Sequence, residues 1–202
     1  MARRTSNPTY VGIDFSLTSP GVAFQEEHEG ITVAAVKTQK NTIPQKQTHR
    51  LHSISNAVIH QIAPFLQSKD IKDTYIFLED YAYGGMGKTF AIAECVGMLK
   101  YKLIMVYGLP YQNLFLVSIP HVKMFCCGKG TASKDTIIKE VYKRWGFDTN
   151  SNDKADAFVL MQMCYAYFNP HVDLTAFQIE ALNRVKAYNE GHPNKKKKAK
   201  KV

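Results

Sequence analysis

The sequence has few cysteines, and they do not form the patterns that bind zinc or build a disulfide framework. Its 202 residues include four cysteines, two of them adjacent, with no C-x-x-C pair. Structural zinc sites and small disulfide-rich domains use paired, regularly spaced cysteines. The pattern therefore favours reduced thiols and a cytoplasmic protein. The four are Cys95, Cys126, Cys127 and Cys164.

Long apolar runs are also absent. A helix that crosses a bilayer needs roughly 18 or more apolar residues in succession, and no stretch of this chain approaches that length. The first ten residues are basic but lack the apolar core of a secretory signal peptide. We therefore expect neither secretion nor a membrane partner.

Acidic residues are outnumbered, with 17 Asp and Glu against 26 Lys and Arg, which gives a formal net charge of +9. Six lysines lie in the last eight residues, and removing them from the 26 leaves 20 basic residues. Most of the excess is thus a tail, residues 191–202, which we expect to be disordered because like charges repel. A hydrophobic content of 45% predicts one folded domain over residues 9–190, after a short extension at residues 1–8.

The order of apolar patterns predicts an α/β fold. Short β-type runs at residues 10–15, 20–24 and 31–36 are close enough to form an antiparallel meander. Apolar runs at residues 75–78 and 114–117 indicate strands buried on both faces. Apolar residues at helical spacing predict helices that pack on this mixed sheet. These helices cover residues 51–65, 89–107, 134–145, 153–168 and 176–189, and Thr175 with Gln178 forms a capping box before the last.

Four carboxylates lie at the ends of predicted elements. Asp14 ends the first strand, and Glu79 ends the strand at residues 76–78. Asp153 and Asp156 are three residues apart at the start of a helix, so they share one face of its first turn. Strand ends and helix starts meet at the rim of a sheet, which allows the four acids to form one cluster. Taken singly, Asp14 also suits a turn, and Glu79 also suits an exposed strand end. Asp153 also suits a helix N-cap, and Asp156 suits the first turn of a helix, where the helix dipole favours an acid.

A cluster of four acids predicts a metal site. Crowded carboxylates raise one another's pKa, and a bound cation relieves their repulsion. Oxygen ligands without Cys or His favour Mg²⁺, with Mn²⁺ as a substitute, over zinc. Two such ions about 3.5–4 Å apart would activate a water and stabilise the leaving oxygen in phosphodiester hydrolysis.

The order of these motifs resembles the RuvC-type Holliday junction resolvases of the ribonuclease H-like superfamily, from phages or bacteria. The resemblance spans residues 11 to about 168 and implies a mixed five-stranded sheet with helices on both faces. It also implies a homodimer that nicks four-way DNA junctions on two strands with Mg²⁺, leaving 5′-phosphate and 3′-hydroxyl ends. The carrying segments are VGIDFSLTSPGVAF (11–24), IFLEDYAYGGMGKT (76–89), VSIPHVKMFCCGKGTASKD (117–135) and NDKADAFVL (152–160).

The resemblance implies roles for individual residues. The four acids would be catalytic metal ligands, and Lys123 and Lys134 would bind phosphate or stabilise the transition state. Lys134 follows a glycine-bearing loop and opens a helix, where backbone N–H groups also face a phosphate; a solvated surface lysine is the alternative interpretation. The family's aromatic wedge position is Ala82 here, so a neighbouring tyrosine would stack on DNA instead. The expected DNA-binding residues are Tyr81, Tyr83, Gly85, Lys88, Lys123, Lys129 and Lys134.

Other functions remain open at this stage. The segment GGMGKT at residues 84–89 resembles the end of a phosphate-binding P-loop, but Ala82 replaces the first glycine of that motif. The acids alone do not distinguish a junction from a flap or an RNA–DNA hybrid as substrate. A branched-DNA-binding protein without catalysis is a third hypothesis, and four acids that would repel phosphate argue against it. The resemblance leaves the roles of the helix at residues 176–189 and of the lysine tail open.

Overall fold

A computed structural model describes residues 8–26, 30–36, 47–66, 71–80 and 89–191. The N-terminal extension, apart from its last residue, and nearly all of the lysine tail lie outside these residues. So do Tyr81, Tyr83, Gly85 and Lys88, four of the expected DNA-binding residues. Within the described part of the chain, no helix is long and apolar enough to cross a membrane, and all four cysteines are free thiols.

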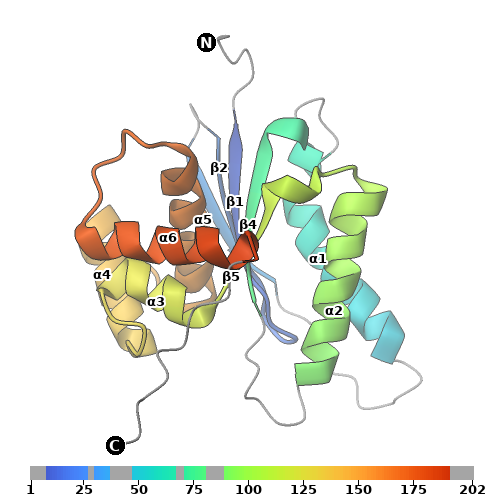
Figure 1. The fold of residues 1–202 in the computed structure, drawn as a ribbon. Helices are drawn as coiled ribbons and strands as arrows, with labels where there is room; N and C mark the ends of the chain where they lie inside the picture. The colour runs from blue at the N-terminus through green and yellow to red at the C-terminus, as the bar shows by residue number, and fades with distance from the viewer. Residues whose placement is uncertain (1–7, 27–29, 37–46, 67–70, 81–88, 192–202) are drawn as a thin grey trace, which may run out of the picture.

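The five strands form one mixed sheet in the order β3-β2-β1-β4-β5 (Figure 1). The predicted meander is confirmed, since β1 pairs antiparallel with β2 and β2 pairs antiparallel with β3. The other side of β1 pairs parallel with β4, which pairs parallel with β5. The strands are β1 (Thr9–Asp14), β2 (Gly21–Glu26), β3 (Ile31–Ala35), β4 (Thr74–Glu79) and β5 (Leu114–Val117).

Helices cover both faces of the sheet, as expected (Figure 1). On one face, α1 (Gln47–Leu66) and α2 (Thr89–Tyr101) pack over a core of aliphatic side chains. On the other face, α5 (Asn152–Phe168) lies against β1 and β2. Three further helices pack around α5: α3 (Ile119–Cys127), α4 (Lys134–Trp145) and α6 (Ala176–Asn189).

Local signals set the ends of the later helices. Ser133 and Ser151 are the N-caps of α4 and α5, and each hydroxyl accepts a backbone N–H from the first turn. Gly128 and Gly146 end α3 and α4 with φ of 75° and 68°, a region that glycine enters without steric cost. The capping box of α6 is confirmed, with the Thr175 N–H donating to Oε1 of Gln178 at 3.0 Å.

Two sequence predictions need correction, and one helix was not predicted. The predicted helix at residues 89–107 is α-helical only to Tyr101 and continues as a π-helical turn over Lys102–Val106. The buried side of the α-helical part carries Cys95, Val96 and Leu99. Strand β5 is not buried on both faces, because it lies at the edge of the sheet and only Val117 is buried. The short helix α3 was not predicted, since its nine residues begin next to a proline and carry a dense apolar run without clear periodicity.

Candidate active site

Strand geometry places two of the four predicted acids side by side. Asp14 is the last residue of β1 and Glu79 the last residue of β4, its parallel neighbour. Ile13 and Leu78, one residue earlier, belong to the core beneath α1 and α2. Because successive side chains of a strand point to opposite faces, Asp14 and Glu79 point to the face that α5 covers.

The first turn of α5 carries the other two acids. Its close approach to the sheet depends on two glycines in β1 and β2. A Cβ at Gly12 would lie 2.2 Å from the carbonyl oxygen of Ala157, and a Cβ at Gly21 would lie 2.0 Å from that of Asp153. Gly21 is also the cross-strand partner of Asp14. The absence of a side chain at Gly21 therefore lets the start of α5 rest directly beside Asp14.

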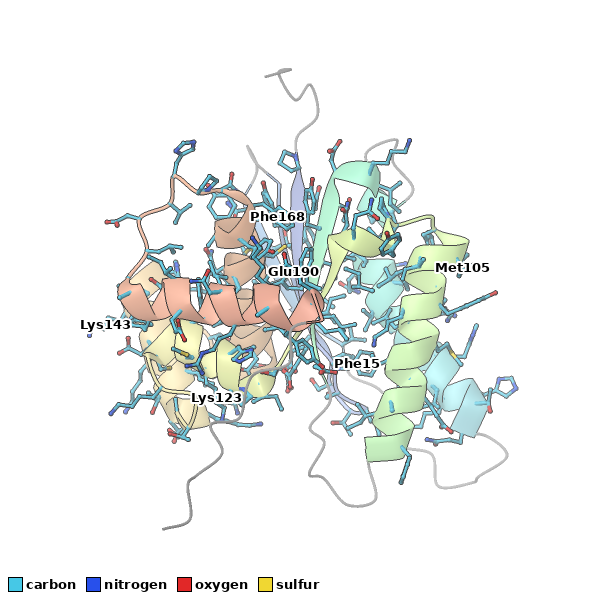
Figure 2. All side chains as sticks on the ribbon, in the orientation of Figure 1. Phe15, Met105, Lys123, Lys143, Phe168 and Glu190 are labelled. Atoms are coloured by element: carbon cyan, nitrogen blue, oxygen red, sulfur yellow. The ribbon has the colours of Figure 1, made fainter. Side chains whose placement is uncertain are left out.

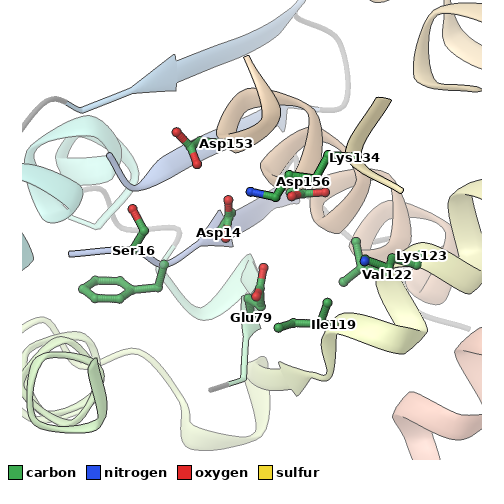
Figure 3. Close-up of a pocket in the computed structure, with 10 residues that line it drawn as sticks. Asp14, Ser16, Glu79, Ile119, Val122, Lys123, Lys134, Asp153 and Asp156 are labelled. Carbon is green, nitrogen blue, oxygen red and sulfur yellow. The ribbon is translucent and has the colours of Figure 1, made fainter. Parts of the chain in front are cut away.

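All four acids line one cavity of about 360 Å³ (Figure 3). Asp14 lies between Glu79 and the acids of α5, so the cluster anticipated from the element ends does form. Lys134 reaches the same cavity from the start of α4, and Lys123 reaches it from α3. The remaining lining residues are Phe15, Ser16, Ile119 and Val122.

Burial and nearby charges raise the pKa values of Asp14, Glu79 and Asp156. Burial is the main cause of the raised pKa of Asp14, followed by the nearby Glu79 carboxylate. Burial also raises the pKa of Glu79 from 4.5 to about 7, and Lys134 and Lys123 oppose this shift. The pKa of Asp156 rises from 3.8 to about 7 through burial and through repulsion by Asp14. A side-chain hydrogen bond with Glu79 further raises the pKa of Asp14, and the same bond lowers the pKa of Glu79.

The chemistry of these donors fits a hard divalent cation. The acids offer only oxygen atoms, the ligands that Mg²⁺ and Mn²⁺ prefer, and a cation among them would offset the burial of their negative charge. As the side chains stand, no group of three or more His, Cys, Asp or Glu residues in the described ranges is close enough to enclose a metal ion.

The two lysines at the cavity differ from Lys129. Lys123 and Lys134 are near enough to the acids to lower the pKa values of Glu79 and Asp156. Lys134 is the first residue of α4, where backbone N–H groups are free of helical partners and an anion is favoured. Lys129 is exposed in the loop between α3 and α4 and does not line the cavity.

Sequence reasoning did not find several residues that shape the site. Gly12 and Gly21 act through contacts with α5, far away in the sequence. Ile119 and Val122 lie on the unpredicted helix α3. The segment after Asp14 is held by Arg50 of α1, whose guanidinium donates to the carbonyl oxygen of Leu17 at 3.0 Å. Of these, only the glycines within β-type runs gave a sequence signal, because glycine in a strand often marks a close approach.

The fold is similar to that of solved RuvC structures. RuvC of Thermus thermophilus matches 76% of this chain and 90% of its own, with a TM-score of 0.53 and 19% identity. A structure of T. thermophilus RuvC in complex with a Holliday junction substrate matches 79% of this chain and 94% of its own, with a TM-score of 0.54 and 18% identity. No family model matches the sequence, and no curated protein matches it. The comparisons establish the fold of this chain as the ribonuclease H-like α/β fold of RuvC.

Proposed function

We propose that this protein is a RuvC-type endonuclease that resolves four-way DNA junctions by paired nicking. The observation that carries the proposal is the cavity in which Asp14, Glu79, Asp153 and Asp156 meet beside two lysines. Burial and the nearby charges raise the pKa values of Asp14, Glu79 and Asp156, and the fold is that of RuvC, which has been solved with a Holliday junction substrate. Buried acids without a stabilising partner would be costly to maintain in a purely structural role.

The four acids would hold two Mg²⁺ ions, for which Mn²⁺ would substitute. Such ions supply an activated water and neutralise the charge that develops on the leaving oxygen. Lys134 and Lys123 add positive charge on the α3–α4 side of the cavity, where a phosphate of the cut strand would lie. The products expected from this chemistry are a 5′-phosphate and a 3′-hydroxyl end.

DNA contacts beyond the cavity remain predictions. Lys129 is exposed beside the site and is suited to a phosphate contact. Tyr81, Tyr83, Gly85 and Lys88 come soon after Glu79 in the sequence, and the resemblance to RuvC-type resolvases gives them DNA contacts. The lysine tail would add contacts that do not depend on DNA sequence.

We place this activity in the cytoplasm of a bacterium or of a phage-infected cell. The free thiols of the four cysteines suit such a reducing compartment.

We also propose a homodimer, because paired nicking needs two sites related by symmetry. One face of α2 and the turn after it expose large apolar side chains that a second copy would cover. Phe90, Tyr101 and Met105 are 80%, 61% and 70% exposed and lie at helical spacing on one side. Gly97 lies between Phe90 and Tyr101, and a Cβ there would meet nothing within 4 Å among the described residues. A glycine inside a helix costs roughly 0.5–1 kcal/mol relative to alanine, and a closely crossing partner helix would account for its presence.

Cleavage of defined DNA substrates tests the proposed function. Labelled four-way junction, flap, linear duplex and RNA–DNA hybrid are each incubated with the protein and Mg²⁺. We expect paired nicks in the junction that ligase can seal, and none when EDTA replaces Mg²⁺. Asp14→Asn should bind the junction but not cut it, because it removes a central ligand. Asp173→Asn, which alters an exposed aspartate between α5 and α6, is the matched control and should cut normally.

Each other outcome points to a different function. Cutting confined to flaps or hybrids would reject the junction resolvase and leave a ribonuclease H-like nuclease. Junction binding without cutting by the parent protein would favour the non-catalytic DNA-binding protein. Normal cutting by Asp14→Asn would show that the four-acid cavity is not the active site.

A further inference from the structure

The end of α6 contacts the sheet beside Glu79. The helix begins near α4 and crosses over α3 and α5 before it reaches the sheet (Figure 1). In Figure 1 the helix crosses this face of the molecule, and its last turn reaches the edge of the sheet at β5. Glu190, labelled in Figure 2, marks this end. Gln178, Ala181 and Val185 are buried along the inner side of α6 and fix its course over α3. The helix is therefore anchored before it reaches the sheet.

Two consecutive residues at the end of α6 bind two neighbouring strands. The side-chain amide of Asn189 accepts from the backbone N–H of Leu116 and donates to the carbonyl oxygen of the same residue, both at 2.9 Å. The hydroxyl of Tyr188 donates to Oδ2 of Asp80 at 2.5 Å, at the short end of the range for such bonds. The last turn of α6 thus joins the end of β4 to the end of β5.

These contacts surround the backbone of Glu79. Asp80 is the next residue, and its N–H donates to the carbonyl oxygen of Val117 at 2.8 Å, which extends the pairing of β4 with β5. Val117 is the register partner of Glu79 and follows Leu116. Asp80 is only 4% exposed, so its hydrogen bond to Tyr188 is shielded from competition by water on the Asp80 side.

Glu79 needs such support. Its carboxyl group shares the cavity with the other three acids, the Asp156 charge repels it, and it lies at the last position of its strand. A strand end that frays would let Glu79 move away from the other acids. The hydrogen bond between Tyr188 and Asp80 opposes this movement at the residue directly after Glu79.

We infer that Tyr188 is a positioning residue for the proposed active site: through Asp80 it holds Glu79 in place against the other acids. The inference rests on the proposed function and gives α6 a role that the resemblance to RuvC leaves open. It predicts that loss of a single hydroxyl on α6 weakens metal binding and cleavage without unfolding the protein. Tyr188 is 38% exposed, so Tyr188→Phe leaves an acceptable surface and a similar packing volume.

The test compares Tyr188→Phe with Tyr142→Phe, which removes the hydroxyl of an exposed tyrosine on α4 away from the cavity. Loss of groups that orient metal ligands typically lowers affinity or activity by about 10–100-fold. We expect a fall of this order in the junction cleavage rate of Tyr188→Phe at saturating DNA. The Mg²⁺ concentration for half-maximal rate should rise, while the KM for junction and the Tm stay close to those of the parent. Tyr142→Phe should match the parent throughout.

A double-mutant cycle with Asp80→Ala identifies the partner. If Tyr188 acts through Asp80, adding Tyr188→Phe to Asp80→Ala should cause little further loss. Full additivity, or an unchanged Mg²⁺ requirement for Tyr188→Phe, would overturn the inference, as would a lower Tm with normal cleavage.

Calorimetric titration of Mn²⁺ into the same proteins separates this inference from the proposed function. If the parent cuts none of the DNA substrates, the proposed function fails. Weaker Mn²⁺ binding by Tyr188→Phe than by Tyr142→Phe would still support the positioning role. Equal Mn²⁺ binding by the two variants would overturn that role.

Discussion

At the cavity, three carboxyl groups have pKa values raised above their usual range because they share one buried site. The cost of burying them appears as protons retained near neutral pH. Lys134 and Lys123 carry two positive charges, which are fewer than the four negative charges of the fully ionised acids. Proton binding and metal binding therefore compete for the same oxygens, and metal affinity should increase as pH rises.

We predict that the free energy of unfolding of the metal-free protein falls between about pH 5 and about pH 8. Glu79 and Asp156 titrate near 7 when folded, but near 4.5 and 3.8 when unfolded. Between these values the folded state binds more protons, so rising pH favours unfolding, by at most about 1.4 kcal/mol per pH unit for each group. Urea unfolding in EDTA at several pH values measures the slope.

Asp14→Asn is the comparison protein for this slope. An amide at this position does not titrate and cannot repel Asp156, so the variant should lose less stability as pH rises. Comparing the two proteins cancels the titration of distant groups such as His121, whose pKa is lowered by burial. Mg²⁺ should stabilise the parent most at the high end of the pH range. Parallel pH profiles for the two proteins would contradict the prediction.

Among the elements, the position of α5 determines whether the four acids meet. The helix lies on β1 and β2 where two glycines leave space for its backbone. Its N-cap Ser151 then sets the start of the first turn. The location of Asp153 and Asp156 is thus fixed by one local signal and one contact distant in sequence.

We predict that Gly21→Ala moves the start of α5 and impairs the site. The new Cβ would lie 2.0 Å from the Asp153 carbonyl oxygen, so the helix must shift. Such overpacking costs about 1–3 kcal/mol, and junction cleavage should fall further than stability alone explains because Asp153 moves. Chemical denaturation and cleavage assays measure the two effects. Gly30→Ala is the control, since a Cβ there meets nothing within 4 Å among the described residues; similar behaviour of the two variants would refute the idea.

These elements also show what the sequence can predict. The bounds of α4 and α6 follow from caps encoded within a few residues, and both were predicted correctly. Asp14 and Glu79 were identified because a charge that ends a buried run is unusual. In contrast, the hydrogen bond between Tyr188 and Asp80 and the approach of α5 to Gly21 join residues far apart in the chain. Sequence patterns hold no direct signal for such pairs, and for the same reason they did not place β5 at an edge.

For the whole molecule, the exposed apolar side of α2 is the surface through which two copies, and so two active sites, would be held together. We predict that the protein is a dimer in solution and that Tyr101→Glu converts it into a monomer, because a buried unpaired charge is costly. Light scattering measures the mass, and Tyr142→Glu, at an exposed tyrosine on α4, is the control. The monomer should nick one strand of a junction at a time. A dimer that persists in Tyr101→Glu would place the interface elsewhere.

The contact between Asn189 and β5 has a consequence for solubility. An edge strand offers unpaired N–H and C=O groups to which another chain can add a strand, and this is a common route to aggregation. Strand β5 is only four residues long, and the Asn189 amide already binds both backbone groups of Leu116. Strand-by-strand association is thereby blocked at this edge, so the last turn of α6 helps to keep the folded protein dispersed at high concentration.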